Sequence, residues 1–151
     1  MNTPQAIQDR YPDEWNHCYG CGRLNDKSLR ITSYWTGDEA ICNYIPKDEQ
    51  TAFPGVLSGG VIASVIDCHS LAAASAAFGA QLGIAENEPL PRCVTASLKV
   101  DFLKPTPLGP VTVRAHAQEI RGRKAIIISH LFSGSEECAR GEVIAVLKPD
   151  A

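Results

Sequence analysis

The chain has 151 residues, the usual size of one domain and enough to bury a core without disulfide or metal staples. Its 14 basic and 17 acidic side chains give a formal net charge of −3, which excludes the basic footprint of a protein that binds nucleic acid or an anionic membrane. We therefore expect the partner to be a small molecule or a second copy of the chain.

The compartment is predicted from the start of the chain and from its cysteines. Residues 1–5 are polar and lack the basic and apolar regions of a secretory signal. The longest uncharged run, residues 70–85, is mostly Ala and Gly and is predicted to be too weakly apolar to span a bilayer. Most of the six cysteines stand singly in apolar segments, which favours free buried thiols over disulfides. We expect a cytoplasmic protein.

The first part of the chain carries one motif with metal-ligand spacing. Residues 1–16 contain two prolines and no sustained period, so we expect an N-terminal extension or a short helix. The segment His17-Cys18-Tyr19-Gly20-Cys21-Gly22 follows. A closed structural zinc site needs four ligands, and no second Cys/His pair follows at finger-like spacing. We therefore predict a Gly-rich turn that leads into the first strand, and neither metal nor cofactor.

The middle of the chain predicts a hairpin and a long buried helix. Residues 29–35 and 40–45 alternate in polarity around Gly37-Asp38, which indicates a β-hairpin. Pro54-Gly55 cannot continue a regular element and Ser58 can cap a helix, so a helix is predicted to begin at residues 58–60 and to end near Gly79 or Gly83. Its apolar residues cover nearly every face, so it is predicted to be buried.

The last part of the chain predicts four strands. Residues 92–103, 111–120, 125–132 and 138–147 carry the apolar or alternating patterns of strands. The connections at 104–110, 121–124 and 134–137 contain the Pro and Gly residues of turns. This order predicts an α+β domain in which an antiparallel sheet wraps around one helix.

Three ordered motifs resemble those of the PaaI-like thioesterases of the hotdog fold. They are residues 18–22, residues 54–60 followed by Asp67, and residues 94–107. The resemblance implies a single hotdog domain over residues 1–151, in which one long central helix lies inside an antiparallel sheet. It also implies homodimers joined edge to edge, often paired into homotetramers, and hydrolysis of acyl-CoA thioesters at the subunit interface. In this family the glycine pair usually follows a histidine, and here Ser58 holds that place.

Thioester hydrolysis needs donors for the developing oxyanion and a base or nucleophile. A helix N-terminus supplies free N–H groups, and glycine lets a substrate approach them closely. Gly59 and Gly60 are therefore the candidates for the oxyanion site, and the alternative is that they only permit a tight start of the helix.

Asp67 is the residue that most requires an explanation, because an unpaired carboxylate on a buried helix is costly. It lies seven residues after Gly60, about 10 Å along the helix. One carbonyl carbon cannot contact both groups, so they must come from different subunits if they serve one reaction. Asp67 is then a general base or a nucleophile, and otherwise it is a hydrogen-bonded carboxylate at an interface. Partial burial is expected to raise its pKa.

Other polar side chains near Asp67 are candidates for substrate binding. His69 lies about 200° around the helix from Asp67, so it is either a satisfied buried histidine or a substrate contact. Two serines at three-residue spacing from Asp67 can bond its carboxylate or a water. Two side chains of the following strand share one face in the predicted alternation and are candidates for the wall of an acyl pocket. With Ser58, these candidates are Ser64, His69, Ser70, Thr95 and Ser97.

The predicted function is therefore an acyl-CoA thioesterase. A hotdog hydratase or dehydratase, which usually pairs an acid with a histidine, is a second hypothesis. A non-catalytic acyl-CoA-binding module is a third, because the motif histidine is replaced by Ser58.

Overall fold

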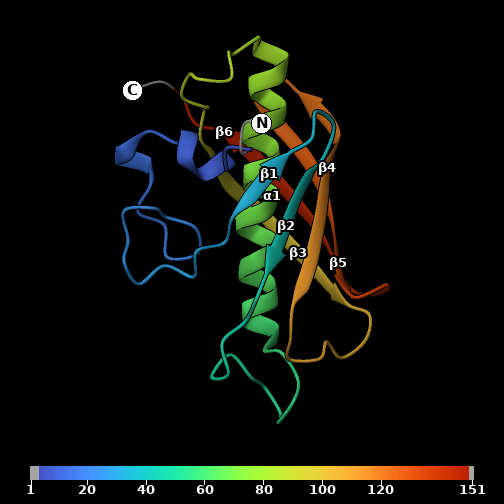
Figure 1. Ribbon diagram of the computed structural model, residues 1–151. Helices are drawn as coiled ribbons and strands as arrows, with labels where there is room; N and C mark the ends of the chain where they lie inside the picture. Colours follow the sequence, from blue (N-terminus) through green and yellow to red (C-terminus); the bar gives the residue numbers. More distant parts are fainter. Residues whose placement is uncertain (1–3, 150–151) are drawn as a thin grey trace.

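The computed structural model describes residues 4–149, in which one long helix lies along one face of a six-stranded sheet (Figure 1). All strand pairs are antiparallel, in the order β1-β2-β4-β5-β6-β3. The elements are the 3₁₀ helices η1 (Ile7–Arg10) and η2 (Asp13–Trp15), the helix α1 (Gly59–Leu82), and the strands β1 (Ser33–Trp35), β2 (Ala40–Tyr44), β3 (Cys93–Phe102), β4 (Val111–Arg121), β5 (Lys124–Ser133) and β6 (Glu136–Leu147). The predicted α+β hotdog architecture is confirmed.

The helix α1 begins and ends where the sequence predicts. The Ile62 amide donates to the Ser58 carbonyl at 3.1 Å, which closes the first turn. At the other end, Gly83 adopts a left-handed conformation with φ 72° and its amide donates to carbonyls of the last turn. Glycine takes this conformation without a steric penalty, so it ends the helix cleanly.

The apolar character of α1 is explained by its position against the sheet. Ala72, Ala73 and Ala74 are fully buried, and their small side chains let the strands approach the helix closely. The helix is long and apolar enough to cross a membrane, but 78% of its most apolar window is buried inside the structure. This burial is typical of a core helix.

The first strand is shorter than predicted. The Leu29 amide donates to the Tyr19 carbonyl at 2.8 Å, and the Ile31 amide donates to the Gly20 carbonyl at 3.0 Å. Residues 29–32 therefore bond to the loop that carries the cysteines, and only Ser33–Trp35 pairs with β2. The predicted hairpin is correct, but the first part of its first strand is wrong.

The strand β3 lies at one end of the sheet. It pairs with β6, and its other edge has no partner among residues 4–149. A β-bulge interrupts the register, because Thr95 lies opposite Ala145 whereas Ser97 lies opposite Ile144. Directly opposed residues share a face of the sheet, so the bulge puts Thr95 and Ser97 on opposite faces. The prediction that these two side chains share one face is wrong.

The N-terminal segment packs beside the helix through aromatic side chains. Tyr11 is buried, whereas Trp15 is 39% exposed and lies under the Lys148 ammonium group, which is 4.1 Å from the ring centroid. The described part of the predicted extension thus contains two short 3₁₀ helices. Residues 1–3 and 150–151 of the predicted single domain lie outside the described residues.

Candidate active site

The first turn of α1 presents glycine backbone at the surface. Gly60 is exposed, Gly59 is half-buried, and the hydroxyl of Ser58 makes no capping hydrogen bond. A helix leaves its first N–H groups without intrahelical partners, and its dipole makes this end positive. A Cβ atom added at Gly59 would lie 3.4 Å from the ring of Phe102, so the glycine also allows close packing at the end of β3. This turn can bind an oxyanion.

Asp67 lies in the third turn of α1 and is half-buried. The Thr95 hydroxyl donates a hydrogen bond of 2.7 Å to Asp67 Oδ1. Burial raises the pKa of the Asp67 carboxyl above its ordinary value, because the charged form loses hydration, and the hydrogen bond from Thr95 partly offsets this effect. A carboxylate with a raised pKa suits a general base that must accept a proton near neutral pH.

The glycine turn and Asp67 lie along the same side of the molecule. Gly59 approaches Phe102 near the end of β3, and Asp67 bonds Thr95 near its beginning, so α1 and β3 lie side by side with opposite directions. Seven residues of helix still separate Gly60 from Asp67 by about 10 Å. The open edge of β3 also exposes three large apolar side chains, Val94, Leu98 and Phe102.

His69 does not reach this side of the helix. It is fully buried, with its Nδ1 atom 2.7 Å from Ser33 Oγ and its Nε2 atom 2.9 Å from the Ala40 carbonyl oxygen. Burial lowers the pKa of His69 to about 4, because the protonated ring cannot be hydrated there. Both ring nitrogens are engaged, so the structure gives His69 the role of a core histidine that ties α1 to β1 and β2.

The remaining predicted polar residues are only partly brought to Asp67. Ser70 is fully buried, and its hydroxyl lies 2.5 Å from Ser129 Oγ. The Ser64 hydroxyl donates to the Gly60 carbonyl at 3.0 Å, within the helix. Ser97 faces away from α1 because of the bulge. The geometry therefore brings Thr95 to Asp67 and keeps Ser70 and Ser97 apart from it.

Three thiols meet beside Asp67, an arrangement that the spacing of the C-x-x-C motif did not predict. Cys18, Cys21 and Cys68 place their sulfur atoms within 4.8 Å of one another. The sequence predicts no metal here because it offers only two cysteines at local spacing, whereas the third comes from α1. Cys21 and Cys68 donate hydrogen bonds to the Cys18 sulfur, which lowers the pKa of the Cys18 thiol. The pKa of Cys68 is raised because it keeps its proton as the donor in this bond.

Sequence reasoning gave no role to Arg92, which lies just before β3. Its guanidinium carbon stacks 4.1 Å from the centroid of the Tyr11 ring. The same cation interacts electrostatically with Cys18 and Cys21, and it acts on Asp67 as well. The only signal in the sequence is a charged residue between a proline and an apolar strand, which is too common to identify such a residue.

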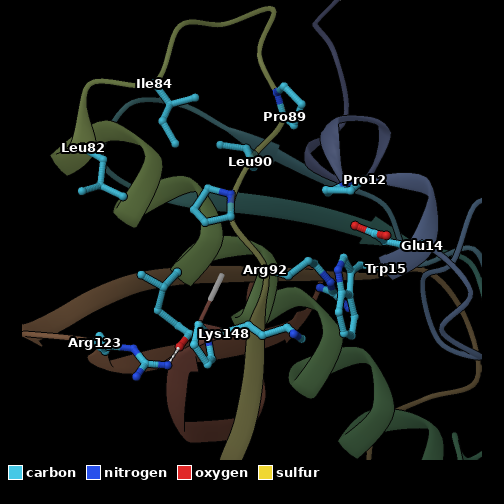
Figure 2. Close-up of a pocket in the computed structure, with 13 residues that line it drawn as sticks. Pro12, Glu14, Trp15, Leu82, Ile84, Pro89, Leu90, Arg92, Arg123 and Lys148 are labelled. Carbon is cyan, nitrogen blue, oxygen red and sulfur yellow. Dashed lines mark hydrogen bonds between the residues drawn. The ribbon is translucent and has the colours of Figure 1, made fainter. Parts of the chain in front are cut away.

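A cavity lies elsewhere, at the C-terminal end of α1 (Figure 2). It encloses about 660 Å³ and is lined by residues of the N-terminal segment, the end of α1 and the end of β6. Arg123 donates to the Leu147 carbonyl at 2.6 Å in its wall. Leu82 in this wall is 15 residues beyond Asp67, about 22 Å along the helix. The cavity therefore does not contain the candidate catalytic groups.

Comparisons with known proteins agree with the fold and with the motifs. The family model described as Thioesterase superfamily matches residues 54–139, which include the glycine turn, Asp67 and Thr95. A thioesterase superfamily protein from Shewanella loihica PV-4 is 38% identical, with a TM-score of 0.68, over 92% of this chain and 100% of that chain.

Two further solved structures share the fold at lower identity. A phenylacetic acid degradation-related protein from Ralstonia eutropha JMP134 is 15% identical, with a TM-score of 0.63, over 79% of this chain and 86% of that chain. A protein from Pyrococcus horikoshii is 17% identical, with a TM-score of 0.66, over 99% of this chain and 97% of that chain. No curated protein matches the chain. With a family model that spans the central helix and most of the sheet, the chain belongs to the thioesterase superfamily.

Proposed function

We propose that this protein hydrolyses acyl-CoA thioesters at sites built between two copies of the chain. The observation that carries the proposal is the position of Asp67. It is a half-buried carboxylate with a raised pKa at the open side of α1, and among residues 4–149 its only hydrogen-bond donor is Thr95. Membership of the thioesterase superfamily supports the same reaction class.

The distance between the two catalytic groups is the reason for a second copy. The amides of Gly59 and Gly60 lie about 10 Å along the helix from Asp67, whereas a thioester carbonyl needs both groups within about 3 Å. A two-fold partner that pairs its β3 antiparallel with this β3 brings its own glycine turn toward Asp67, because α1 lies beside β3 and the two-fold axis reverses the direction of the partner's α1. Two equivalent sites result from one symmetric interface.

The edge of β3 favours such a partner. An open strand edge presents unpaired N–H and C=O groups, which makes it a template for pairing with another chain. Leu98 is 39% exposed and Phe102 is 56% exposed on this strand. A second copy that covers these apolar side chains and pairs with this strand edge would stabilise a homodimer. The face of the sheet opposite α1 would remain free, so two dimers could pair through it into a tetramer.

The groups then have distinct roles. Gly59 and Gly60 donate backbone hydrogen bonds to the carbonyl oxygen as it becomes an oxyanion. Asp67 of the facing copy takes a proton from a water whose oxygen attacks the carbonyl carbon. The C–S bond then breaks, the thiolate leaves with its electron pair, and Asp67 returns the proton to the sulfur. The products are a carboxylic acid and free CoA.

The test is hydrolysis of a panel of acyl-CoA esters, with free CoA measured by liquid chromatography. We expect Asp67→Asn to lower kcat by about 10²–10⁴-fold, because the amide cannot accept the proton. Asp38→Asn is the matched control, since Asp38 is an exposed acid in the turn between β1 and β2, at the opposite end of the sheet from β3. Unchanged turnover in Asp67→Asn would remove Asp67 from the mechanism, and tight binding of acyl-CoA without release of CoA would favour a binding module.

The hydratase hypothesis receives no comparable support. It needs a histidine that can exchange a proton with the substrate, and both nitrogens of His69 are bonded inside the core. The exposed side of Asp67 has no histidine partner among the described residues.

A further inference from the structure

The three thiols beside Asp67 have the geometry of a metal site. Cys18 Sγ and Cys68 Sγ lie 3.8 Å apart, and Cys21 completes a set whose sulfur atoms all lie within 4.8 Å of one another. With Zn–S bonds of about 2.3 Å, two thiolates of a tetrahedral zinc site lie about 3.8 Å apart. A disulfide instead needs an S–S separation of about 2 Å. The spacing of the cluster therefore fits a shared ion better than a covalent bond.

The backbone is folded to hold the sulfurs in this arrangement. The Gly22 amide donates to the Cys18 carbonyl at 2.7 Å, which closes the loop over the C-x-x-C motif. A Cβ atom added at Gly20 would lie only 2.3 Å from Cys68 Sγ, so the loop approaches the helix sulfur as closely as a glycine allows. The loop and α1 thus already place their sulfur atoms around the position that one metal ion would occupy.

The charge near the cluster also fits a metal-thiolate centre. Arg92 interacts electrostatically with Cys18 and Cys21, and its buried Nη1 atom has no hydrogen-bond partner among residues 4–149. Arg92 is half-buried, and a nearby negative charge favours its charged form. Three thiolates and one divalent cation carry a net charge of −1, which the Arg92 guanidinium neutralises. With three neutral thiols or a disulfide, the Asp67 carboxylate would be left to balance this cation.

We propose that Cys18, Cys21 and Cys68 bind one Zn²⁺ ion as thiolates, with a water molecule in the fourth position. Cys21 and Cys68 are buried, whereas the half-buried Cys18 marks the side from which solvent reaches the ion. Each thiol that is protonated before binding releases its proton to solvent, and no redox change occurs. The ion would fix the N-terminal loop to the residue that follows Asp67, so it would hold the candidate base in position.

The test uses the full chain, purified under reducing conditions and freed of metal with a chelator. Co²⁺ is the probe, because thiolate ligation gives sulfur-to-cobalt charge-transfer bands and strong visible bands of a tetrahedral ion. We expect one Co²⁺ per chain, displaced by one equivalent of Zn²⁺. This spectroscopic readout does not depend on thioesterase activity, so failure here and failure of the proposed function are distinguishable.

Variants test whether the three cysteines are the ligands that give the Co²⁺ bands. Loss of a hydrogen bond to a metal ligand alone typically costs about 10–100-fold in metal affinity. Loss of a ligand in Cys18→Ser, Cys21→Ser or Cys68→Ser should therefore weaken Zn²⁺ binding by at least about tenfold. Cys138→Ser is the matched control, because Cys138 is buried but lies outside the cluster. Circular dichroism and gel filtration check the folding of each variant, and Cys18→Ser, at the least buried position, keeps the test valid if Cys68→Ser does not fold.

Two results would overturn the proposal. One is a reduced wild-type chain that gives no thiolate charge-transfer band with excess Co²⁺, or a band that Cys18→Ser leaves unchanged. The other is a reduced chain without affinity for Zn²⁺ whose mild oxidation links Cys18 to Cys68 in peptide mass spectra, which would make the cluster a redox pair.

Discussion

The hydrogen bond between Thr95 and Asp67 is the contact that tunes the candidate base. It stabilises the ionised carboxylate, whereas burial favours the neutral form. The two effects oppose each other, so the pKa of Asp67 depends on a side chain that never touches the proton in transfer. Thr95 is therefore a positioning residue with a measurable effect on the pH profile.

Thr95→Val removes the hydroxyl but keeps the shape of the side chain. The pKa of Asp67 should then rise further, since the one favourable hydrogen bond to the carboxylate is lost. Because the base must be ionised, the acidic limb of the kcat/KM profile should move to higher pH. Thr95→Ser, which keeps the hydroxyl, should leave that limb in place. An acidic limb that stays fixed in Thr95→Val would show that the contact has no influence on the base.

His69 couples stability to pH in a defined window. The pKa of His69 is about 4 in the folded chain, below the ordinary histidine value of 6.5, so the unfolded chain binds the proton first as pH falls. The contribution of neutral His69 to the free energy of unfolding is complete above pH 6.5, and it is lost as the pH falls toward 4. The loss amounts to about 3 kcal/mol at 1.36 kcal/mol per pKa unit.

Urea unfolding between pH 4 and 7 measures this coupling. His69→Gln can keep hydrogen bonds to its neighbours but does not titrate, so its unfolding free energy should vary less with pH than that of the wild type. His116→Gln changes an exposed histidine and should preserve the wild-type dependence. Equal pH dependence in wild type and His69→Gln would contradict the burial of a neutral imidazole.

The sequence predicted some residues of the site and not others, for physical reasons. The positions of the glycine turn and of Asp67 follow from helix signals and from the cost of a buried acid. The bond from Thr95 to Asp67 and the turning away of Ser97 depend on a bulge in β3, which no alternation pattern reveals. The third thiol of the cluster comes from Cys68, 50 positions after Cys18, and only the packing of α1 brings it there.

The contact between α1 and the sheet is tight at one defined point. A Cβ atom added at Gly141 of β6 would lie 2.3 Å from Ile66 Cγ2. Ile66 is fully buried one residue before Asp67, so this glycine sets the depth at which α1 lies. The position of the candidate base thus depends on the absence of a side chain on the facing strand.

Gly141→Ala should destabilise the fold by about 1–3 kcal/mol, the usual cost of overpacking a core. In the Ile66→Ala background the same change should cost less, because the clashing atom is gone, so a double-mutant cycle should show coupling. Gly109→Ala is the control, since a Cβ atom there meets nothing within 4 Å. Additive effects of Gly141→Ala and Ile66→Ala in urea unfolding would contradict this packing.

At the level of elements, periodicity predicted the long strands closely, including the edge strand β3. Strands β4, β5 and β6 lie within a residue or two of their predicted bounds, because their alternation reflects one face against α1. The predicted strand over residues 29–35 fails at its start, where the chain bonds the cysteine loop instead. A hydrophobic pattern cannot show whether a segment will pair with β2 or with the cysteine loop.

At the level of the whole molecule, the single chain leaves its candidate site incomplete. The amides of the glycine turn lie at the N-terminal end of α1, and the Asp67 carboxylate lies about 10 Å further along the helix. The large cavity near Leu82 contains neither group. The proposed association through the edge of β3 would bring the two groups together. Each active site would then take its amides from one copy and its carboxylate from the other.

Mixed dimers test this central claim most directly. Asp67→Asn removes the base, and Gly60→Pro removes one amide donor at a position in the first helical turn, where proline is tolerated. Each variant alone should be nearly inactive. If the chain forms two-fold dimers with shared sites, equal co-expression should restore about a quarter of wild-type activity, because each mixed dimer keeps one unaltered site. Activity no higher than that of the separate variants, with mixed dimers demonstrated by mass, would contradict the shared site.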